Sequence, residues 1–335
     1  MKGFDSKFKD IPDYILKITY QIWENQDVES IREYYGDVPK ISLPTPTRAP
    51  SGIIYGAEPV VQSTYAALKM FPDRQLLGED IIWIGNDDEG YFSSHRILST
   101  ATHSNDGIYG KATGKKIFYR GIADCACRDN LVYDEWLVRD QGAIVRQLGI
   151  DPKKFAENQI AEEGGKENAQ KPLNEDTPCD SIYTPPTLPE NNIAQDYANI
   201  LTEIFNTKQY TVFENEYDRA IQQFQPGGFV KYGRTEAFDF WNKIFSAFPN
   251  AKLNIEHLSF VHDQNQSPKA AVRWTLVGKH DGNGYFGAPT GTNIYMLGIN
   301  HVEFGPRGIK NEWVLFDETM TVSYTHLTLP TILLV

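Results

Sequence analysis

Two aspartates stand at matching places in the sequence and could move protons. Asp140 ends the segment EWLVRD (135–140), and Asp317 ends the segment EWVLFD (312–317). Side chains alternate along a strand, so Trp136 shares one face with Asp140, and Trp313 shares one with Asp317. A carboxyl in an apolar concavity has a raised pKa and suits acid–base catalysis. If the tryptophan face lines a pocket, Asp140 and Asp317 are the first catalytic candidates.

The same aspartates suit a structural role. Aspartate is a favoured N-cap, because its carboxylate accepts hydrogen bonds from the first free N–H groups of a helix. The chain runs from Asp140 directly into the apolar segment Ala143-Ile144-Val145. Capping and catalysis therefore both stay open for these residues.

Asp124 and His301 occupy equivalent positions on the strand that precedes each aspartate segment. Both are proton-transfer groups with apolar neighbours, such as Ile122 and Ile299. They either line a pocket or lie at an edge that faces solvent. If both copies were catalytic, their chemistry would differ at this position.

His103 and His280 each precede a glycine-containing segment that ends in Thr-Gly. A histidine at such a place either acts as a base or fixes the loop by hydrogen bonds. Thr113-Gly114 and Thr290-Gly291 are typical of turns. They are not a phosphate loop, because no Lys-Ser/Thr follows.

Arg96 and Arg273 also match, and each lies in the middle of a predicted strand. A buried arginine needs a carboxylate partner or an anionic ligand, and Glu135 and Glu312 are the partners that we predict. His95 has only a valine at its equivalent position, so any role of His95 belongs to the first copy. Trp23, near the start of the chain, is predicted to be core or pocket wall.

These matches arise from an internal duplication with a constant offset of 177 residues. Tyr55-Gly56 pairs with Tyr232-Gly233, Phe71-Pro72 with Phe248-Pro249, and the register holds without a gap to Asp140 and Asp317. Residues with special backbone geometry recur throughout, which chance does not produce.

Each copy predicts helices followed by antiparallel strands, which is an α+β domain with a curved sheet and a pocket in its concavity. A helix over 57–70 recurs at 235–247, and each ends at Phe-Pro because proline cannot continue a helix. We predict four strands in each copy, at 76–84, 92–102, 116–128 and 131–139 and at 253–261, 269–279, 293–304 and 309–316.

The predicted domains are residues 1–151 and 193–321, joined by a polar linker over 152–192. Residues 322–335 resemble the translation of a sequencing-library adapter. The second copy loses its similarity to the first soon after Asp317. We therefore expect a non-native tail and a missing natural C-terminus, and we give His326 no functional weight.

The net charge and the cysteine content exclude some classes of binding partner. The net charge is −12 and the calculated pI is about 5.1, and no basic stripe interrupts the acidic residues, so nucleic-acid binding is not expected. Cys125 and Cys127 lack nearby histidines for a zinc site and are predicted to be small buried side chains. We expect no signal peptide, no membrane span, no metal and no cofactor, and a cytoplasmic location.

The pattern His-x6-Gly-x2-Thr-Gly, followed by Trp-x3-Asp, resembles the SnoaL-like polyketide cyclases of the NTF2-like superfamily. It occurs from His103 to Asp140 and again from His280 to Asp317. The resemblance covers nearly all of both copies. It implies tandem NTF2-like cone-shaped half-barrels, each with a curved antiparallel sheet wrapped around N-terminal helices.

The resemblance implies acid–base chemistry on a small apolar carbonyl compound, by aldol-type cyclisation or isomerisation. The superfamily also contains hydrolases, dehydratases and ligand binders without catalysis, and these alternatives stay open. A duplication can replace a homodimer, so one copy is expected to pair with the other, while homo-oligomers stay open too.

Overall fold

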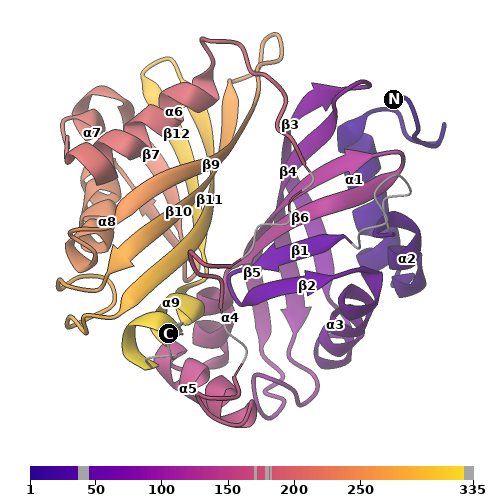
Figure 1. Cartoon of the computed structure of the whole chain (residues 1–335), viewed down its shortest axis with the longest axis horizontal. Coiled ribbons are helices and arrows are strands. Elements are labelled where there is room, and N and C mark those ends of the chain that lie inside the picture. The colour runs from indigo at the N-terminus through magenta and orange to yellow at the C-terminus, as the bar shows by residue number, and fades with distance from the viewer. Residues whose placement is uncertain (37–44, 170–171, 178–180, 182, 328–335) are drawn as a thin grey trace. The chain divides into compact units, whose positions relative to one another are not determined.

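The computed structural model describes residues 1–36, 45–169, 172–177, 181, 183–327, with the remaining positions outside the described part (Figure 1). The described chain forms two compact units. Unit 1 comprises Met1–Arg139 and Pro178–Pro189, and unit 2 comprises Asp140–Thr177 and Glu190–Val335. Each unit has its own sheet and its own hydrophobic core.

Unit 1 begins with helices and continues with strands. Asp10 caps the first helix by accepting a hydrogen bond from the backbone N–H of Asp13. A π-helical turn, η1 (Tyr20–Glu24), extends it. The elements of this unit are α1 (Ile11–Thr19), α2 (Ile31–Tyr34), β1 (Pro46–Ala49), β2 (Gly52–Tyr55), α3 (Ala57–Met70), β3 (Gln75–Asn86), β4 (Gly90–Thr102), β5 (Lys116–Arg128) and β6 (Leu131–Arg139).

Unit 2 repeats this order after two additional helices. A second π-helical turn, η3 (Glu203–Thr207), follows its helix α6 as η1 follows α1. The elements are α4 (Gln141–Leu148), α5 (Pro152–Glu162), α6 (Ile193–Thr202), α7 (Val212–Asn215), β7 (Tyr217–Gln225), β8 (Phe229–Tyr232), α8 (Arg234–Ala247), β9 (Lys252–Val261), β10 (Lys269–Lys279), β11 (Asn293–Gly305), β12 (Gly308–Phe316) and α9 (Glu318–Leu327).

The two six-stranded sheets have the same topology, which confirms the α+β class and the tandem repeat of the NTF2-like architecture. Their strand orders are β2-β1-β6-β5-β4-β3 and β8-β7-β12-β11-β10-β9. Within each unit α1 contacts β3 and β4, and α6 contacts β9 and β10, so equivalent helices cover equivalent strands of a curved sheet (Figure 1).

One pair of strands per unit was not expected from the sequence. The hairpins β1–β2 and β7–β8 precede α3 and α8, and β1 and β7 run parallel to β6 and β12. β1, β2 and β8 have four residues each. A pattern that alternates with period two cannot be recognised over so few positions. β7 has nine residues, but buried and exposed positions do not alternate regularly along it.

The repeated Tyr-Gly pair has a backbone reason. Gly56 and Gly233 stand at the N-caps of α3 and α8 with φ angles of 80° and 89°. Most side chains are strained in this left-handed region, whereas glycine is not. The two glycines thus let the chain turn from the hairpin into the helix.

The helices α4 and α5 belong to unit 2, although we predicted that residues up to 151 complete the first domain. Arg146 on α4 forms an ion pair with Glu318 at the start of α9. α5 also contacts α9. These helices follow the first copy in the sequence, but they pack against α9 of unit 2.

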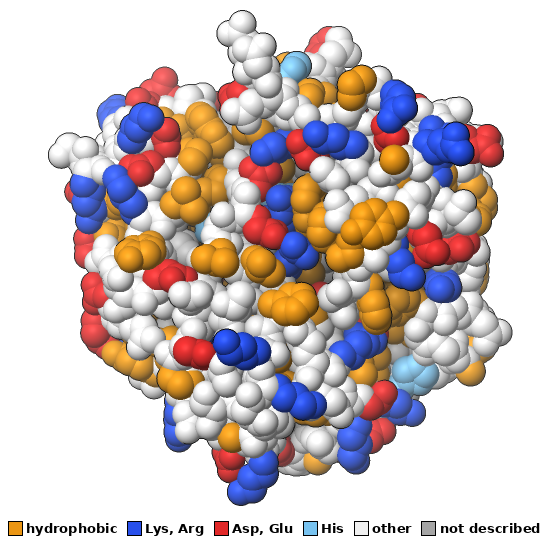
Figure 2. Space-filling view, turned by 180° about the vertical axis from the view of Figure 1, so that it is seen from behind, with side chains coloured by type: hydrophobic (Ala, Val, Ile, Leu, Met, Phe, Trp, Pro, Cys, Tyr) orange, Lys and Arg blue, Asp and Glu red, His pale blue; other side chains and the backbone are white. Residues whose placement is uncertain are grey.

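Residues 328–335 of the expected non-native tail lie outside the described part of the chain, and α9 extends through residues 322–327. No helix in the described part is long and apolar enough to cross a membrane. On the face drawn in Figure 2, acidic and basic side chains are interspersed among apolar ones.

Candidate functional site

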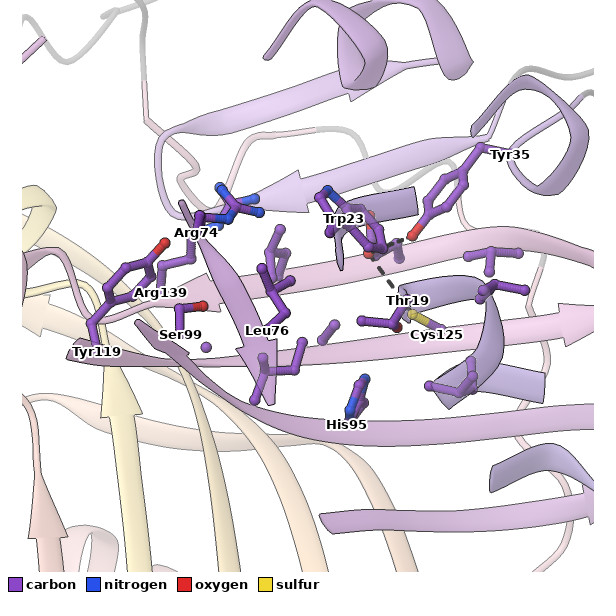
Figure 3. A pocket seen from close by; sticks show the side chains of 18 residues that line it. Thr19, Trp23, Tyr35, Arg74, Leu76, His95, Ser99, Tyr119, Cys125 and Arg139 are labelled. Atoms are coloured by element: carbon purple, nitrogen blue, oxygen red, sulfur yellow. Dashed lines mark hydrogen bonds between the residues drawn. The ribbon is translucent and has the colours of Figure 1, made fainter. Parts of the chain in front are cut away.

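A cavity of about 60 Å³ lies inside unit 1, between the first helical segment and the sheet (Figure 3). In this measure a water molecule needs about 10–15 Å³, so the cavity has room for a small ligand or a few waters. It is lined by Ile15, Ile18, Thr19, Trp23, Tyr35, Arg74, Leu76, His95, Ile97, Ser99, Tyr119, Gly121, Ala123, Cys125, Val132, Glu135, Leu137 and Arg139.

The alternation along β6 presents Glu135, Leu137 and Arg139 to this cavity, not Trp136. The expectation that the tryptophan face lines the pocket is therefore wrong for this cavity. Trp136 packs instead beneath the guanidinium of Arg48, 4.7 Å from its ring centroid. Side chains alternate between the two faces of a strand. A prediction that assigns the wrong face to the pocket therefore misplaces every candidate residue on that strand.

Glu135 is the carboxylate at the cavity wall. It is only 5% exposed and accepts hydrogen bonds from the hydroxyl groups of Tyr35 at 3.1 Å and Thr47 at 2.9 Å. The Cys125 Sγ lies 3.8 Å from the same carboxylate. Burial raises the pKa of Glu135, and the hydrogen bond from Thr47, the charge of Arg139 and the hydrogen bond from Tyr35 partly oppose that rise.

The unpredicted β1–β2 hairpin supplies one of these partners. Thr47 lies on β1, directly beside Glu135 in the parallel β1–β6 pairing. Cys125 is the antiparallel partner of Glu135 on β5. Tyr35 comes from the segment after α2. Three separate elements therefore fix the position of one carboxylate.

The other end of the cavity is basic. In Figure 3 Arg74 and Arg139 lie near Ser99 and Tyr119, apart from the Tyr35 end. Arg74 is 9% exposed, and its Nε has no hydrogen-bond partner in the described part of the chain. Burial, and to a lesser degree the neighbouring Arg139 charge, lowers the pKa of the Arg74 guanidinium.

His95 lies between the two ends. It is 2% exposed, and its Nε2 has no hydrogen-bond partner among the described residues. Burial, reinforced by the adjacent Arg96 charge, lowers the pKa of His95 to about 3. The imidazole is therefore neutral at pH 7 and offers either a donor or an acceptor to a ligand.

The equivalent positions of unit 2 are filled. Trp274, Leu276, Met296 and Phe316 stand where unit 1 has Ile97, Ser99, Tyr119 and Arg139, and all four are buried in the core of unit 2. The ring of Trp274 lies so close to Gly298 that a Cβ there would be 2.1 Å from Cζ2. Larger apolar side chains thus occupy the volume that stays open in unit 1.

Glu312, the counterpart of Glu135, is held by a similar set of donors. Its carboxylate accepts hydrogen bonds from Tyr197 at 2.6 Å, Tyr217 at 3.0 Å and Gln223 at 2.6 Å. Burial raises the pKa of Glu312 as it does that of Glu135. Gln223 lies on β7, so the short hairpin again supplies a partner.

Asp140 and Asp317 both cap helices. Asp140 accepts a hydrogen bond from the N–H of Ala143 at 2.9 Å, and also from those of Gly227 and Gly228. Asp317 accepts from the N–H of Met320 at 3.1 Å. Burial raises the pKa of each aspartate to about 6, against the effect of these hydrogen bonds. Neither aspartate lines the cavity of unit 1, and their catalytic role stays a prediction.

Asp124 and His301 are buried, but Asp124 alternates with the cavity-lining Ala123 and Cys125 and so lies on the opposite face of β5. Its antiparallel partner is Trp136, and that of His301 is Trp313. The two equivalent positions therefore share the tryptophan side of their sheets.

His103 and His280 each fix a loop. In both, Nδ1 lies 3.2 Å from a threonine hydroxyl, that of Thr113 or Thr290. The carbonyl of His103 also accepts a hydrogen bond from the N–H of Gly114. Burial lowers the pKa of both imidazoles. These contacts agree with the loop-fixing alternative.

Arg96 pairs with Glu79 at 3.0 Å and Asp80 at 3.8 Å, so the expectation that Glu135 is its partner is wrong. Arg96 and Glu135 lie on opposite faces of the sheet, which excludes a direct contact. Arg273 lies opposite His257 in the equivalent pairing of β10 with β9. Of the candidates singled out for the pocket, Trp23 lines the cavity.

Arg74, Arg139, Ser99 and Tyr35 were not predicted from the sequence as site residues. A signal for most of them was present. At some cavity positions unit 1 has a polar residue and unit 2 an apolar one, as at Arg74 and Ala251 or Ser99 and Leu276. A site that exists in only one copy is formed by residues that differ between the copies. A comparison that looks for identical residues therefore does not find it.

Among the described residues, no cluster of three or more His, Cys, Asp and Glu side chains is arranged to hold a metal ion. Cys125 and Cys127 are buried and unpaired, and burial raises the pKa of both thiols. Both are therefore protonated at neutral pH.

A curved mixed sheet that shelters N-terminal helices on one face defines each unit as an NTF2-like α+β domain. Residues 195–322 match the SnoaL-like polyketide cyclase family. Unit 1 repeats the topology of unit 2, so the chain carries this fold twice. No curated protein matches the sequence.

Solved structures of single domains are similar to part of the chain. AclR from Streptomyces galilaeus is 22% identical, with a TM-score of 0.35, over 41% of this chain and 83% of its own. IdmH from Streptomyces antibioticus is 20% identical, with a TM-score of 0.34, over 42% and 98%. A SnoaL-like polyketide cyclase from Agrobacterium tumefaciens is 15% identical, with a TM-score of 0.34, over 42% and 100%.

Proposed function

We propose that this protein catalyses proton transfer on a small, largely apolar carbonyl compound, and that the reaction takes place in the cavity of unit 1. Aldol-type cyclisation and isomerisation both require such a step. The observation that carries the proposal is a buried carboxylate, Glu135, at the wall of an otherwise largely apolar cavity.

The chemistry follows from the surroundings of Glu135. Burial raises its pKa, and a carboxyl group with a raised pKa is better suited to accept a proton and return it. As the base, it removes a proton from the carbon beside the ligand carbonyl, and the electron pair moves to the carbonyl oxygen. The resulting enolate attacks a second carbonyl or takes the proton back at another carbon.

Unit 2 serves in this proposal as a structural copy. Trp274, Leu276 and Phe316 occupy the equivalent volume in the core of unit 2, so the space that stays open in unit 1 is taken up by side chains there. Glu312 instead joins Tyr197 and Tyr217 to the sheet. In this proposal unit 1 carries out the reaction and unit 2 contributes stability.

A second candidate function is ligand binding without turnover. The observation in its favour is that Glu312 keeps the same kind of hydrogen bonds in a filled unit, so a glutamate at this position has a structural use by itself. Under this reading Glu135 also joins Tyr35 and Thr47 to the sheet.

Exchange of the α-protons of cyclohexanone in D2O, followed by proton NMR, tests the proposal. The wild-type protein should accelerate exchange, and Glu135→Gln should reduce the acceleration by about 100-fold or more, the usual contribution of a general base. Glu312→Gln is the matched control, because it removes the equivalent carboxylate from the filled unit and should leave exchange unchanged.

Three outcomes count against the proposal. Exchange that survives in Glu135→Gln would remove Glu135 from the mechanism, and its loss in Asp140→Asn or Asp317→Asn would assign it to those aspartates. If cyclohexanone binds to the wild-type protein without faster exchange, binding without turnover is the better description.

A further inference from the structure

Arg74 is a buried cation without a protein counter-ion. Its side chain makes no ion pair with any described residue, and its Nε has no hydrogen-bond partner. The nearby groups that act on its charge are Tyr119, Arg139, Tyr109 and Glu24. The only carboxylate among them, Glu24, lies beyond ion-pair distance and accepts a hydrogen bond from the N–H of Leu76.

Other buried arginines of unit 1 are paired. Arg48 forms an ion pair with Asp134, and Arg96 forms one with Glu79. Removing a guanidinium from water without a partner is costly, so such groups are normally neutralised. The isolation of Arg74 is therefore a cost to the fold that a bound anion would offset.

A second cation stands beside it. Arg139, at the end of β6, lines the same part of the cavity and lowers the pKa of Arg74 through charge repulsion (Figure 3). Two guanidinium groups and the hydroxyls of Ser99 and Tyr119 converge on this end of the cavity. Arginine binds carboxylates through paired N–H donors, which makes this end suited to a planar anion.

The filled unit lacks both cations. The positions equivalent to Arg74 and Arg139 carry Ala251 and Phe316, which are buried in the core of unit 2. The arginines thus occur together with the cavity and are absent where it is filled.

We propose that the ligand of this cavity carries a carboxylate, which Arg74 binds together with Arg139, and that it is a small apolar keto acid. This inference rests on the proposed site, since it assigns the substrate class of the same cavity. Glu135, at the opposite end, repels a carboxylate and so fixes the orientation of the ligand. Its apolar body lies against Ile97 and Leu137, and its reactive carbon faces Glu135.

Binding of benzoate and of its uncharged isostere benzamide tests this orientation, measured by isothermal titration calorimetry on the full chain. The wild-type protein should bind benzoate at least tenfold more tightly. Arg74→Met should abolish this preference and leave benzamide binding unchanged, whereas Arg74→Lys should retain part of it. Lys111→Met is the control, because it removes an exposed cation that does not line the cavity.

Stability provides a second readout. If Arg74 is held for a ligand, Arg74→Met should raise the urea midpoint of the free protein, since it removes an unpaired buried charge. A lower midpoint would assign Arg74 a structural role and overturn the inference. Equal affinity of the wild-type protein for benzoate and benzamide would overturn it too, but would leave the proposed site intact. If neither compound binds, the proposed site and the inference both fail.

Discussion

Glu135 and Glu312 show how one residue serves two environments. Both are buried, both accept hydrogen bonds from tyrosine hydroxyls, and burial raises the pKa of both. Glu135 borders the cavity of unit 1, whereas large apolar side chains occupy the equivalent volume of unit 2. The glutamate itself therefore does not distinguish a site from a core, and the neighbouring side chains decide.

Asp140 allows a test of its capping role at the residue scale. Asp140→Ala removes an acceptor for three backbone N–H groups and should lower the free energy of unfolding of unit 2 by about 2 kcal/mol, at the upper end for an N-cap. Asp140→Asn should cost clearly less, because asparagine is an equally good cap. Urea denaturation of both variants measures the difference, and equal losses would contradict the capping role.

The pKa of Asp140 adds a dependence on pH. Its value of about 6 in the folded protein exceeds the value of about 4 in an unfolded chain, so the folded state binds the proton more tightly. The resulting stabilisation is complete below about pH 4 and is lost as the pH rises through about 6.

This stabilisation belongs to the carboxyl group and should be missing in Asp140→Asn. The difference in unfolding free energy between the wild type and this variant should therefore change by about 2–3 kcal/mol between pH 4 and pH 7. The wild type becomes less stable relative to the variant as the pH rises. Urea denaturation at several pH values measures it. A difference independent of pH would show that folding does not raise the pKa of the Asp140 carboxyl group.

At the scale of elements, the strands β4 and β10 decide whether a unit is hollow. They pair identically with their neighbours, yet Ile97 and Ser99 on β4 correspond to Trp274 and Leu276 on β10. Trp274 also donates a hydrogen bond from Nε1 to Asn300 at 3.0 Å. The backbone is thus shared, and side-chain volume alone separates a cavity from a core.

Trp274→Ile, which introduces the residue of unit 1, should hollow unit 2. We expect it to lower the free energy of unfolding by about 3 kcal/mol, because a large ring is lost from a packed core. Trp313→Ile is the matched control and should cost less, since Trp313 is only partly buried and stacks on Phe224. Thermal and urea unfolding measure both, and equal losses would contradict the packing argument.

At the scale of the whole molecule, the chain changes units at Asp140 rather than at the predicted linker. Gly227 and Gly228 donate hydrogen bonds to Asp140, and Glu318 pairs with Arg146. The helices α4 and α5, which follow the first copy in the sequence, are thus part of unit 2.

A fragment of residues 140–327 should therefore be more stable than one of residues 190–327. The shorter fragment leaves Glu318, whose side chain is only 6% exposed, without Arg146, and breaking such a pair costs about 3 kcal/mol. Urea denaturation of both fragments measures the difference. Arg146→Met in the full chain should reproduce much of the loss, and fragments of equal stability would contradict this assignment of α4.

Much of the fold was predictable because it depends on local patterns. The offset of 177 residues revealed the repeat, Phe-Pro marked the ends of α3 and α8, and the long alternating segments gave the four main strands. The strands β1 and β7 were missed, because their positions depend on pairing with β6 and β12, far along the chain.

The sequence by itself determined the duplication, the type of each long element and which side chains share a face of a strand. Only the tertiary structure decided which face turns towards the helices, and so brought Glu135 rather than Asp140 to the cavity. It also decided that unit 1 is hollow and unit 2 filled. The physical reason is that alternation is a property of one strand, whereas concavity and free volume depend on how all the strands and helices pack together.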